Sequence, residues 1–353
     1  MEMGRKMRRF DYSFIKDLRI SVNIMSSVNR IELSRSMEAE RKKSNGDVFS
    51  ALESFARMQS IKGSNAIEGI STNDERMKEI LNKNSAPLSH DEEEIKGYRD
   101  ALDMIHNGHG SMDISERMIK DLHRVMLSYT NEQGGAYKTS NNLIAKVDRE
   151  GYKEIIFRPV ISEKTPMAME QLILAYTVAA QDAGINKMIL IPCFILDFLC
   201  IHPFTDGNGR VSRLLSLMLM YNNGMDVGKY ISFEGQINDN KDLYYNALNA
   251  SSTDWHINGN DYVPFIQNFI FTLSSCYKEL NERFTLVGDK KFNKVNRIEA
   301  TVLNSLIPIS KKKISELLPD VSLRTIESKL SEMIKEDKIK KIGSYKDARY
   351  VRT

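Results

Sequence analysis

The spacing of apolar residues is the first feature of this chain that indicates a structure. Over most of the first two thirds, apolar side chains return every three or four positions, with polar residues between them. This spacing places the apolar side chains on one face of an α-helix, and it predicts helices at 47–71, 89–106, 114–127 and 167–184. We therefore expect a mainly α protein in which these faces pack on a shared core.

One segment in this part of the chain departs from the helical pattern. Residues 141–160 read NNLIAKVDREGYKEIIFRPV, two β-prone runs on either side of turn-forming residues 148–151. Such a pattern is typical of a β-hairpin. The hairpin precedes a polar motif at 202–213, and we expect it to form a flap over that motif.

The pattern changes again after residue 290. Three short helical patterns lie between residues 296 and 338, the last with Ser322 as its N-cap, and two strand patterns follow over 339–353. Three helices followed by a hairpin is the order of a winged helix, a variant of the helix-turn-helix. We expect a separate winged-helix domain of mixed α and β structure over 289–353.

Length and composition add the number of domains and the compartment. A chain of 353 residues can bury a large core and typically divides into two or three domains. The basic start is followed by no apolar signal segment, and no run approaches the roughly 18 apolar residues of a membrane helix. We expect a cytoplasmic protein with no membrane partner, and we expect Cys193, Cys200 and Cys276 to be core thiols.

Charge is distributed unevenly along the chain. Residues 289–353 hold 16 Lys and Arg against 9 Asp and Glu, whereas the whole chain has a net charge of only +3. A basic winged helix favours phosphate contacts, so DNA is a candidate partner through Arg324, Lys329, Lys346 and Arg349. The alternatives are that this domain docks a protein or joins two copies of the chain in a homodimer.

The strongest chemical signal is the stretch IHPFTDGNGRVSR at 201–213, which interrupts an apolar helical run. Pro203 has no backbone N–H and disfavours helix at the residue before it, so a helix should end near Ile201 with His202 at its end. The glycine-rich loop that follows begins a second helix. Its free N–H groups and the helix dipole form an anion cradle.

Charged residues around this loop indicate which anion binds. Arg210 and Arg213 lie three apart in the first turns of the second helix, so both guanidinium groups can reach it. An acid among anion-binding groups, Asp206, indicates a bridging divalent cation, for which Mg²⁺ is the usual choice. With His202 as a proton acceptor, the set describes a nucleoside triphosphate site. No second carboxylate that could activate water is apparent nearby, so transfer to a hydroxyl fits better than hydrolysis.

The wording HPFTDGNGRVSR resembles the signature of the Fic domain, HPFx(D/E)GNGRxxR, at every specified position. The resemblance implies a Fic-type helical core that uses Mg²⁺ and transfers AMP from ATP to a Tyr, Thr or Ser hydroxyl of a protein, the chain itself included. It also implies roles for the matching residues: proton acceptor for His202, Mg²⁺ ligand for Asp206, phosphate lining for Gly207, Asn208 and Gly209, and β- and γ-phosphate binding for Arg210 and Arg213.

A second motif resembles the inhibitory motif of the same family, (S/T)xxxE(G/N). It is SNAIEGI at 64–70, in which Ser64, Glu68 and Gly69 fill the specified positions. Its place before the core is similar to that in the class with an N-terminal inhibitory helix. The resemblance implies that Glu68 pairs with Arg213 and occupies the guanidinium that the γ-phosphate needs.

Two further segments are similar to parts of this family. The segment from GGAYKTSNN to IIFRPV resembles the flap region, which pairs with an extended target segment as an added strand. KDLYYNALNAS is similar to the stretch whose tyrosine lies by the adenine, so Tyr244 and Tyr245 are candidate nucleotide-binding residues. The alternative for this pair is packing within a core helix.

The resemblance and the apolar pattern together divide the chain into three predicted regions. We expect an N-terminal helical region over 1–110 with the inhibitory motif at 64–69, a catalytic core over 111–275, and the winged helix over 289–353. A DNA-binding transcriptional regulator, and an enzyme that removes AMP or transfers another phosphoryl group, stay open as alternatives.

Overall fold

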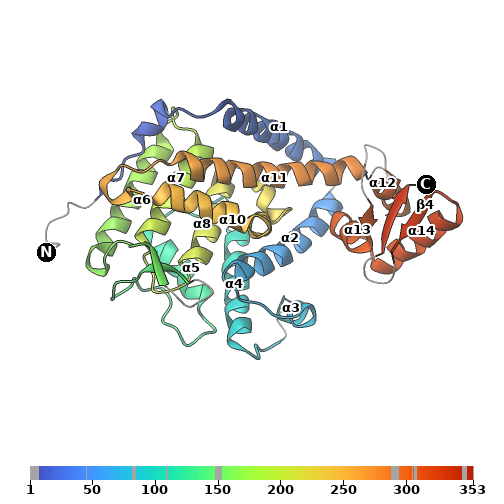
Figure 1. Cartoon of the computed structure of the whole chain (residues 1–353), viewed down its shortest axis with the longest axis horizontal. Helices are drawn as coiled ribbons and strands as arrows, with labels where there is room; N and C mark the ends of the chain where they lie inside the picture. The colour runs from blue at the N-terminus through green and yellow to red at the C-terminus, as the bar shows by residue number, and fades with distance from the viewer. Residues whose placement is uncertain are drawn as a thin grey trace.

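The structure is a computed structural model that describes residues 8–44, 46–81, 85–108, 110–147, 153–287, 294–303, 305, 308–343 and 348–352. Helices make up most of it, and its strands form two small antiparallel sheets (Figure 1). The prediction of a mainly α protein is therefore confirmed. The turn predicted at 148–151 lies outside the described residues.

The larger part of the molecule is a bundle of packed helices. The predicted helices correspond to α2, α4, α5 and α6, whereas α1 was not anticipated because its apolar residues are sparse. Among the described helices, none is long and apolar enough to cross a lipid bilayer. The helices of the bundle are α1 (Val22–Ser44), α2 (Gly46–Ile67), α3 (Asp74–Leu81), α4 (His90–Asn107), α5 (Glu116–Met126), α6 (Thr165–Gln181), α7 (Lys187–Ile201), α8 (Asn208–Asn222), α9 (Phe233–Asp239), α10 (Lys241–Ser252) and α11 (Val263–Val287).

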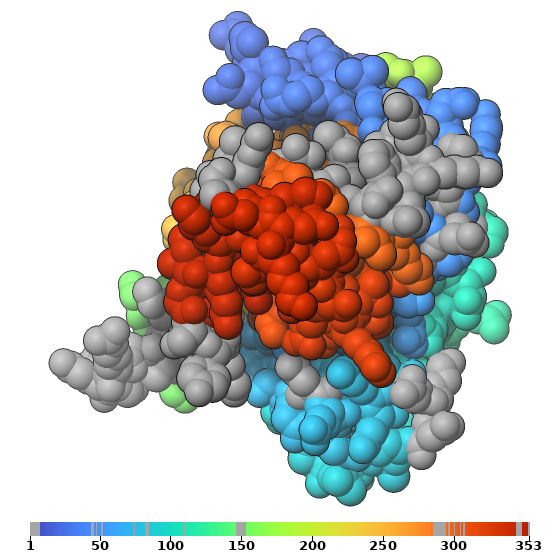
Figure 2. All heavy atoms as spheres, turned by 90° about the vertical axis from the view of Figure 1, so that its right-hand side faces the viewer, coloured from blue at the N-terminus to red at the C-terminus, as the bar shows by residue number. Residues whose placement is uncertain are grey.

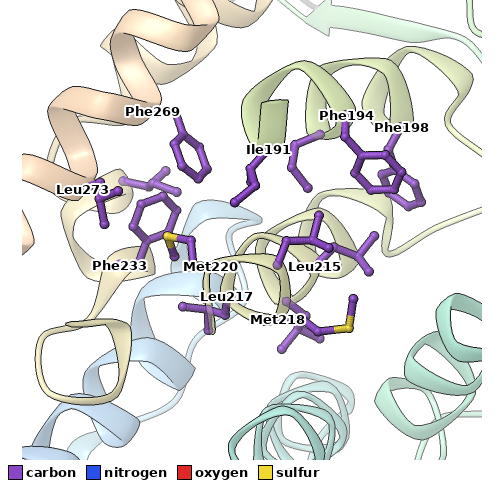
Figure 3. Close-up of a cluster of buried hydrophobic side chains, with 14 of the residues drawn as sticks. Ile191, Phe194, Phe198, Leu215, Leu217, Met218, Met220, Phe233, Phe269 and Leu273 are labelled. Carbon is purple, nitrogen blue, oxygen red and sulfur yellow. The ribbon is translucent and has the colours of Figure 1, made fainter. Parts of the chain in front are cut away.

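The centre of this bundle is formed by α7 and α8. Every residue of α7 after its first is buried, and so is most of α8. Phe194 and Phe198 of α7 and Leu215 of α8 belong to a buried apolar cluster that continues to Phe233 of α9 (Figure 3). Close packing on all sides leaves these two helices little freedom, so the loop between them has a fixed position. The three cysteines are buried free thiols, as expected.

The predicted hairpin is formed by β1 (Ile144–Val147) and β2 (Lys153–Phe157), which pair antiparallel. The end of β2 rests on aromatic residues. The ring of Phe157 stacks on His256 at a centroid distance of 5.4 Å and meets Trp255 edge-on at 6.3 Å. These contacts fix one end of the hairpin to the segment between α10 and α11.

Trp255 also joins the N-terminal segment to α7. Its indole N–H donates to the buried carboxylate of Asp197 at 2.6 Å, and the hydroxyl of Tyr12 donates to the same carboxylate at 2.8 Å. The guanidinium of Arg8 lies over the indole ring, 4.6 Å from its centroid, and donates to the Trp255 carbonyl. One buried ring therefore contacts the N-terminal segment, α7 and the hairpin.

The C-terminal part forms a small lobe at one end of the molecule (Figures 1 and 2). Its elements are α12 (Lys294–Leu303), β3 (Ile309–Ser310), α13 (Lys311–Leu317), α14 (Leu323–Lys335), β4 (Ile339–Ile342) and β5 (Arg349–Arg352), and its antiparallel sheet has the order β3-β5-β4. The lobe has a hydrophobic cluster separate from that of the bundle. The three helices and two longer strands match the expected order, while two-residue β3 has no periodicity to reveal it.

The charges of this lobe correct one expectation about DNA. Lys329 was expected to contact phosphates, but it is only 5% exposed, and its Nζ lies 2.9 Å from Glu299 and 2.7 Å from Glu332. That expectation is wrong, because the charge of this lysine is already paired within the lobe. Arg324 and Arg349 are exposed, and Lys346 lies outside the described residues. DNA binding by the lobe stays a prediction.

Candidate functional site

His202 follows the last residue of α7 and has a backbone conformation that residues other than glycine rarely adopt. Its φ is 53°, in the left-handed region, and its backbone N–H donates to the Phe198 carbonyl at 2.9 Å. The helix cannot continue because Pro203 follows. The ring Nδ1 lies 3.3 Å from the carbonyl oxygen of Leu199, to which its N–H donates a hydrogen bond. This contact leaves Nε2 as the nitrogen able to accept a proton.

The surroundings of His202 keep its ring neutral. Burial, followed by the positive charge of Lys138, lowers the pKa of His202 to about 4. A histidine with this pKa is unprotonated near neutral pH, which is the state that a general base requires.

The backbone of the loop after His202 is held by hydrogen bonds with Asn208 and Lys138. The Asn208 amide accepts from the N–H of Phe204 and donates to its carbonyl, both at 2.9 Å. Lys138 donates from Nζ to the Ile201 carbonyl at 3.1 Å and from its backbone N–H to the Pro203 carbonyl at 2.9 Å. Asn208 therefore uses its side chain within the loop, and only its remaining atoms can face a ligand. Lys138 lies in the segment before the hairpin and was not among the predicted site residues.

His123 of α5 packs behind the loop. Its ring stacks on Phe204 at a centroid distance of 3.8 Å, and its Nδ1 accepts from the N–H of Gly135 at 2.9 Å. Nε2 therefore carries the proton and donates to the Asp206 carbonyl at 3.1 Å. Burial lowers the pKa of His123 to about 4, which favours this neutral form.

Two glycines at the start of α8 leave room for side chains from other elements. Gly207 has a φ of 75°, and a Cβ there would collide with Met126. A Cβ on Gly209 would lie 2.5 Å from a carboxylate oxygen of Glu68. The missing side chain of Gly209 thus allows the Glu68 carboxylate to lie against the N-terminus of α8, which is a position that favours an anion.

Glu68 reaches this position from the end of α2, and it contacts Arg213 there. Arg213 donates from Nη2 to Glu68 at 2.7 Å, from Nε to the Ser64 hydroxyl at 2.8 Å, and from Nη2 to the Ser64 carbonyl at 3.0 Å. Gly69, with a φ of 85°, turns the chain away directly after Glu68. The structure therefore brings Ser64 and Glu68 of the motif into contact with Arg213 of α8.

The first arginine, Arg210, has two carboxylate partners. It is 2% exposed; its Nη1 forms an ion pair with Glu94 of α4, and its Nη2 donates to Asp206 at 3.0 Å. Its Nε has no hydrogen-bond acceptor among the described residues. Glu94 was not among the predicted site residues. Two further carboxylates, Glu68 and Glu94, do lie near the loop, but each is paired with an arginine. The expectation that no second carboxylate activates water stays a prediction.

These groups surround a pocket of about 280 Å³. It is lined by Glu68, Ile70, Glu94, His202, Asp206, Gly207, Asn208, Gly209 and Arg210. The pocket therefore combines the neutral histidine, the N-terminus of α8 and the charged groups of three separate elements.

Three of the expected nucleotide contacts do not line this pocket. Arg213 lies behind Glu68 and is buried, and Tyr244 and Tyr245 lie side by side on α10. Burial raises the pKa of both tyrosines, and the negative charge of Glu68 adds to the effect. The two rings are thus close enough to feel Glu68, but they do not border the pocket itself.

The pocket can be tested for its fit to Mg²⁺. The Asp206 carboxylate borders the pocket and is 60% exposed, and a hard oxygen ligand of this kind suits that ion. The described residues contain no group of three or more His, Cys, Asp or Glu side chains able to hold a metal. Asp206 fits as one ligand of a cation whose other ligands come from bound substrate and water.

A family comparison identifies the segment that contains the loop. Residues 113–220 match the model of the Fic/DOC family. The chain contains a Fic domain. The matched segment includes α5, the hairpin, α7 and most of α8, and so includes His202, Asp206 and both arginines. Glu68 and Glu94 reach the Fic domain from α2 and α4, outside the matched segment.

Several solved structures have a similar fold. A Fic family protein from Desulfovibrio desulfuricans G20 is 19% identical, with a TM-score of 0.61, over 95% of this chain and 97% of that one. A Fic domain protein from Bacteroides thetaiotaomicron is 23% identical, with a TM-score of 0.57, over 73% and 95%. A fragment of Fic-1 from C. elegans is 16% identical, with a TM-score of 0.54, over 75% and 72%. At these identities the likeness shows the fold alone.

One curated protein matches a shorter part of the sequence. The ribonucleoside-diphosphate reductase small chain of Ostreid herpesvirus 1 is 31% identical over 126 residues, which is 33% of this chain. The match spans only 20% of that protein's length. The activity in its name therefore stays with that protein.

Proposed function

We propose that the chain transfers AMP from ATP to a hydroxyl side chain of a protein, and that Glu68 holds this activity down. One observation carries the proposal: the pocket places a neutral His202 beside the N-terminus of α8 and the guanidinium of Arg210. An anion cradle beside a proton acceptor is the arrangement that phosphoryl or nucleotidyl transfer to a hydroxyl needs.

In the proposed reaction the hydroxyl oxygen of the target attacks the α-phosphorus of ATP. The bond from that phosphorus to the bridging oxygen of the β-phosphate breaks, and pyrophosphate leaves. His202 Nε2 takes the hydroxyl proton, while Arg210, Arg213 and the N–H groups of α8 hold the phosphates. Mg²⁺ at Asp206 would neutralise phosphate charge.

Regulation follows from the place of Glu68. Its carboxylate lies against Gly209 and bonds to Arg213, so it occupies an anion position at the start of α8. A γ-phosphate that needs Arg213 competes with this carboxylate for the same N–H groups. The Glu68 side chain is 32% exposed, so solvent can receive it when it leaves. The Glu68–Arg213 pair therefore blocks productive ATP binding until Glu68 is displaced.

The hairpin is proposed to bind the target. Among the described residues, β1 and β2 pair only with each other, so each has an unpaired outer edge. An extended segment of a target can add to such an edge as a third strand. The segment before β1 is bonded through Lys138 to the loop after His202, which links the bound strand to the proton acceptor.

The experiment compares ATP labelled on the α-phosphate with ATP labelled on the γ-phosphate. Glu68→Gly protein is incubated with each, with Mg²⁺ and a cell lysate, and His202→Ala serves as the inactive control. The proposal expects protein bands labelled from the α-position only, absent with His202→Ala. Label from the γ-position would identify phosphate transfer, and loss of label from a pre-labelled protein would identify removal of AMP. No label from either position would overturn the proposal.

A further inference from the structure

We propose that Glu94 is a positioning residue: it anchors Arg210 from α4, so that Asp206 can leave Arg210 and bind a divalent cation. The inference rests on the proposed function, because it concerns how the same pocket takes Mg²⁺ with ATP. It assigns a role to a carboxylate that lies outside the Fic signature and outside the matched segment.

The contacts of Arg210 place it between two unlike acids. Asp206 lies four residues before Arg210, in the loop that precedes α8, and is 60% exposed, whereas the Glu94 side chain is 10% exposed and comes from a separate helix. An exposed aspartate on a loop can turn toward a ligand in the pocket. A buried glutamate within a helix cannot turn in the same way, so Glu94 stays with Arg210.

The charge balance gives this arrangement a purpose. A buried guanidinium without a carboxylate partner is strongly unfavourable, so a lone Asp206 would be held by Arg210 and withheld from a cation. With Glu94 in place, Arg210 keeps one carboxylate when Asp206 departs. The Nη2 group that Asp206 releases is then available to phosphate oxygens.

Glu94 differs from Glu68 in ways that separate positioning from inhibition. Glu68 directly follows the end of α2, and its side chain is three times as exposed as that of Glu94. Glu68 also lies against the start of α8, where the phosphates are expected, while Glu94 pairs with Nη1 of Arg210. Displacing Glu94 after Asp206 has turned away would leave the buried guanidinium of Arg210 without a carboxylate, so we infer that Glu94 remains in place during the reaction.

The adjacent acid provides a matched control. Glu93 precedes Glu94 on α4, and both meet His90: Glu93 lies 3.4 Å from Nδ1 and Glu94 lies 3.3 Å from Nε2. Within the described part of the chain, no ion pair joins Glu93 to Arg210. Glu93→Gln therefore removes the same charge from the same helix turn without touching the arginine. Glu94→Asp keeps the charge but shortens the reach by one methylene group.

The experiment measures binding rather than turnover. Affinity for an ATP analogue with a methylene group between the α- and β-phosphates, which cannot transfer AMP, is measured by calorimetry with and without Mg²⁺. All variants carry Glu68→Gly. For each variant we take the ratio of the affinity with Mg²⁺ to the affinity without it. We expect this ratio to be at least about fivefold smaller in Glu94→Gln than in Glu93→Gln, and to be intermediate in Glu94→Asp. If Glu94→Gln does not fold, the comparison of Glu94→Asp with Glu93→Gln gives the same test.

The outcomes distinguish this inference from the proposed function. An equal Mg²⁺ effect in all variants would overturn the positioning role of Glu94. A higher AMP transfer rate in Glu94→Gln on the wild-type background would also overturn it, because Glu94 would then be a second blocking acid. Absence of analogue binding in every variant, Glu68→Gly alone included, would instead overturn the proposed function.

Discussion

Arg210 of the helical bundle and Lys329 of the C-terminal lobe are both buried cations on helices, but their surroundings differ. Arg210 borders a pocket and shares its charge with Glu94 and the exposed Asp206. Lys329 contacts Glu299 and Glu332 and borders neither of the two pockets described for the molecule. The comparison teaches that a count of basic residues locates charge but not a binding site. A binding site is better indicated by a buried charged side chain that borders a pocket.

The largest expected effect lies on the pocket side of this comparison. His202→Ala should lower AMP transfer by about 10²- to 10⁴-fold, because a positioned base contributes that much to proton transfer. ATP affinity should change little, because the imidazole is not a phosphate ligand in the proposal. Rates at equal ATP occupancy test this, with Lys329→Ala as the counterpart: it should lower the melting temperature and leave the rate unchanged. Equal rates for wild type and His202→Ala would remove the histidine from the mechanism.

The next effect concerns the exposed carboxylate that meets Arg213. Glu68→Gly should raise the transfer rate roughly 5- to 150-fold, which corresponds to about 1 to 3 kcal/mol of preference for the blocked state. Combining Glu68→Gly with Arg213→Ala should cancel most of the gain, because the released guanidinium is then missing. Initial rates with α-labelled ATP measure both variants. A Glu68→Gly rate at or below wild type would contradict inhibition, and an active double variant would indicate general loosening of the fold.

A smaller effect is expected on the pH dependence. Burial and then Lys138 lower the pKa of His202 to about 4, compared with about 6.5 for an ordinary histidine. A depressed pKa keeps the ring neutral as the pH falls, so at pH 5 about nine tenths of it stays neutral, compared with about 3% at the ordinary pKa. The rate at saturating ATP should therefore change less than about twofold between pH 7 and 5. A fall centred near pH 6.5 would show that the working site is open to water.

The smallest effect on transfer should come from the C-terminal lobe. Removing residues 288–353 should leave the rate within about threefold, because the pocket, the hairpin and both acids lie upstream and the lobe has its own core. Loss of activity in a folded, monodisperse truncation would show that the lobe contributes to the site.

For DNA, gel-shift titrations at two salt concentrations should show weaker, salt-dependent binding for Arg324→Ala and no change for Lys329→Ala.

The sequence could predict the helices with regular apolar spacing. It could also predict the proposed phosphate-binding loop at 202–213, because the residues that form it are close together in the sequence. It could not single out Glu94, because Glu92, Glu93 and Glu94 form one acidic run without distinguishing neighbours. The fold separates them: Glu92 bonds to Arg76, Glu93 and Glu94 both meet His90, and of the three only Glu94 pairs with Arg210. Helical periodicity likewise places Lys329 on α14 but cannot show that its charge is paired through tertiary contacts.

The contacts of Trp255 give the protein an internal optical reporter. It is the only tryptophan in the chain, and its side chain is almost completely shielded from water. Its ring meets Phe157 at the end of β2, the Arg8 guanidinium and the Asp197 carboxylate. Indole emission therefore comes from one site, and water reaching the ring would shift that emission to longer wavelength. A target or fragment that lifts β2 from this aromatic support would be seen in the fluorescence of the unlabelled, otherwise unmodified protein.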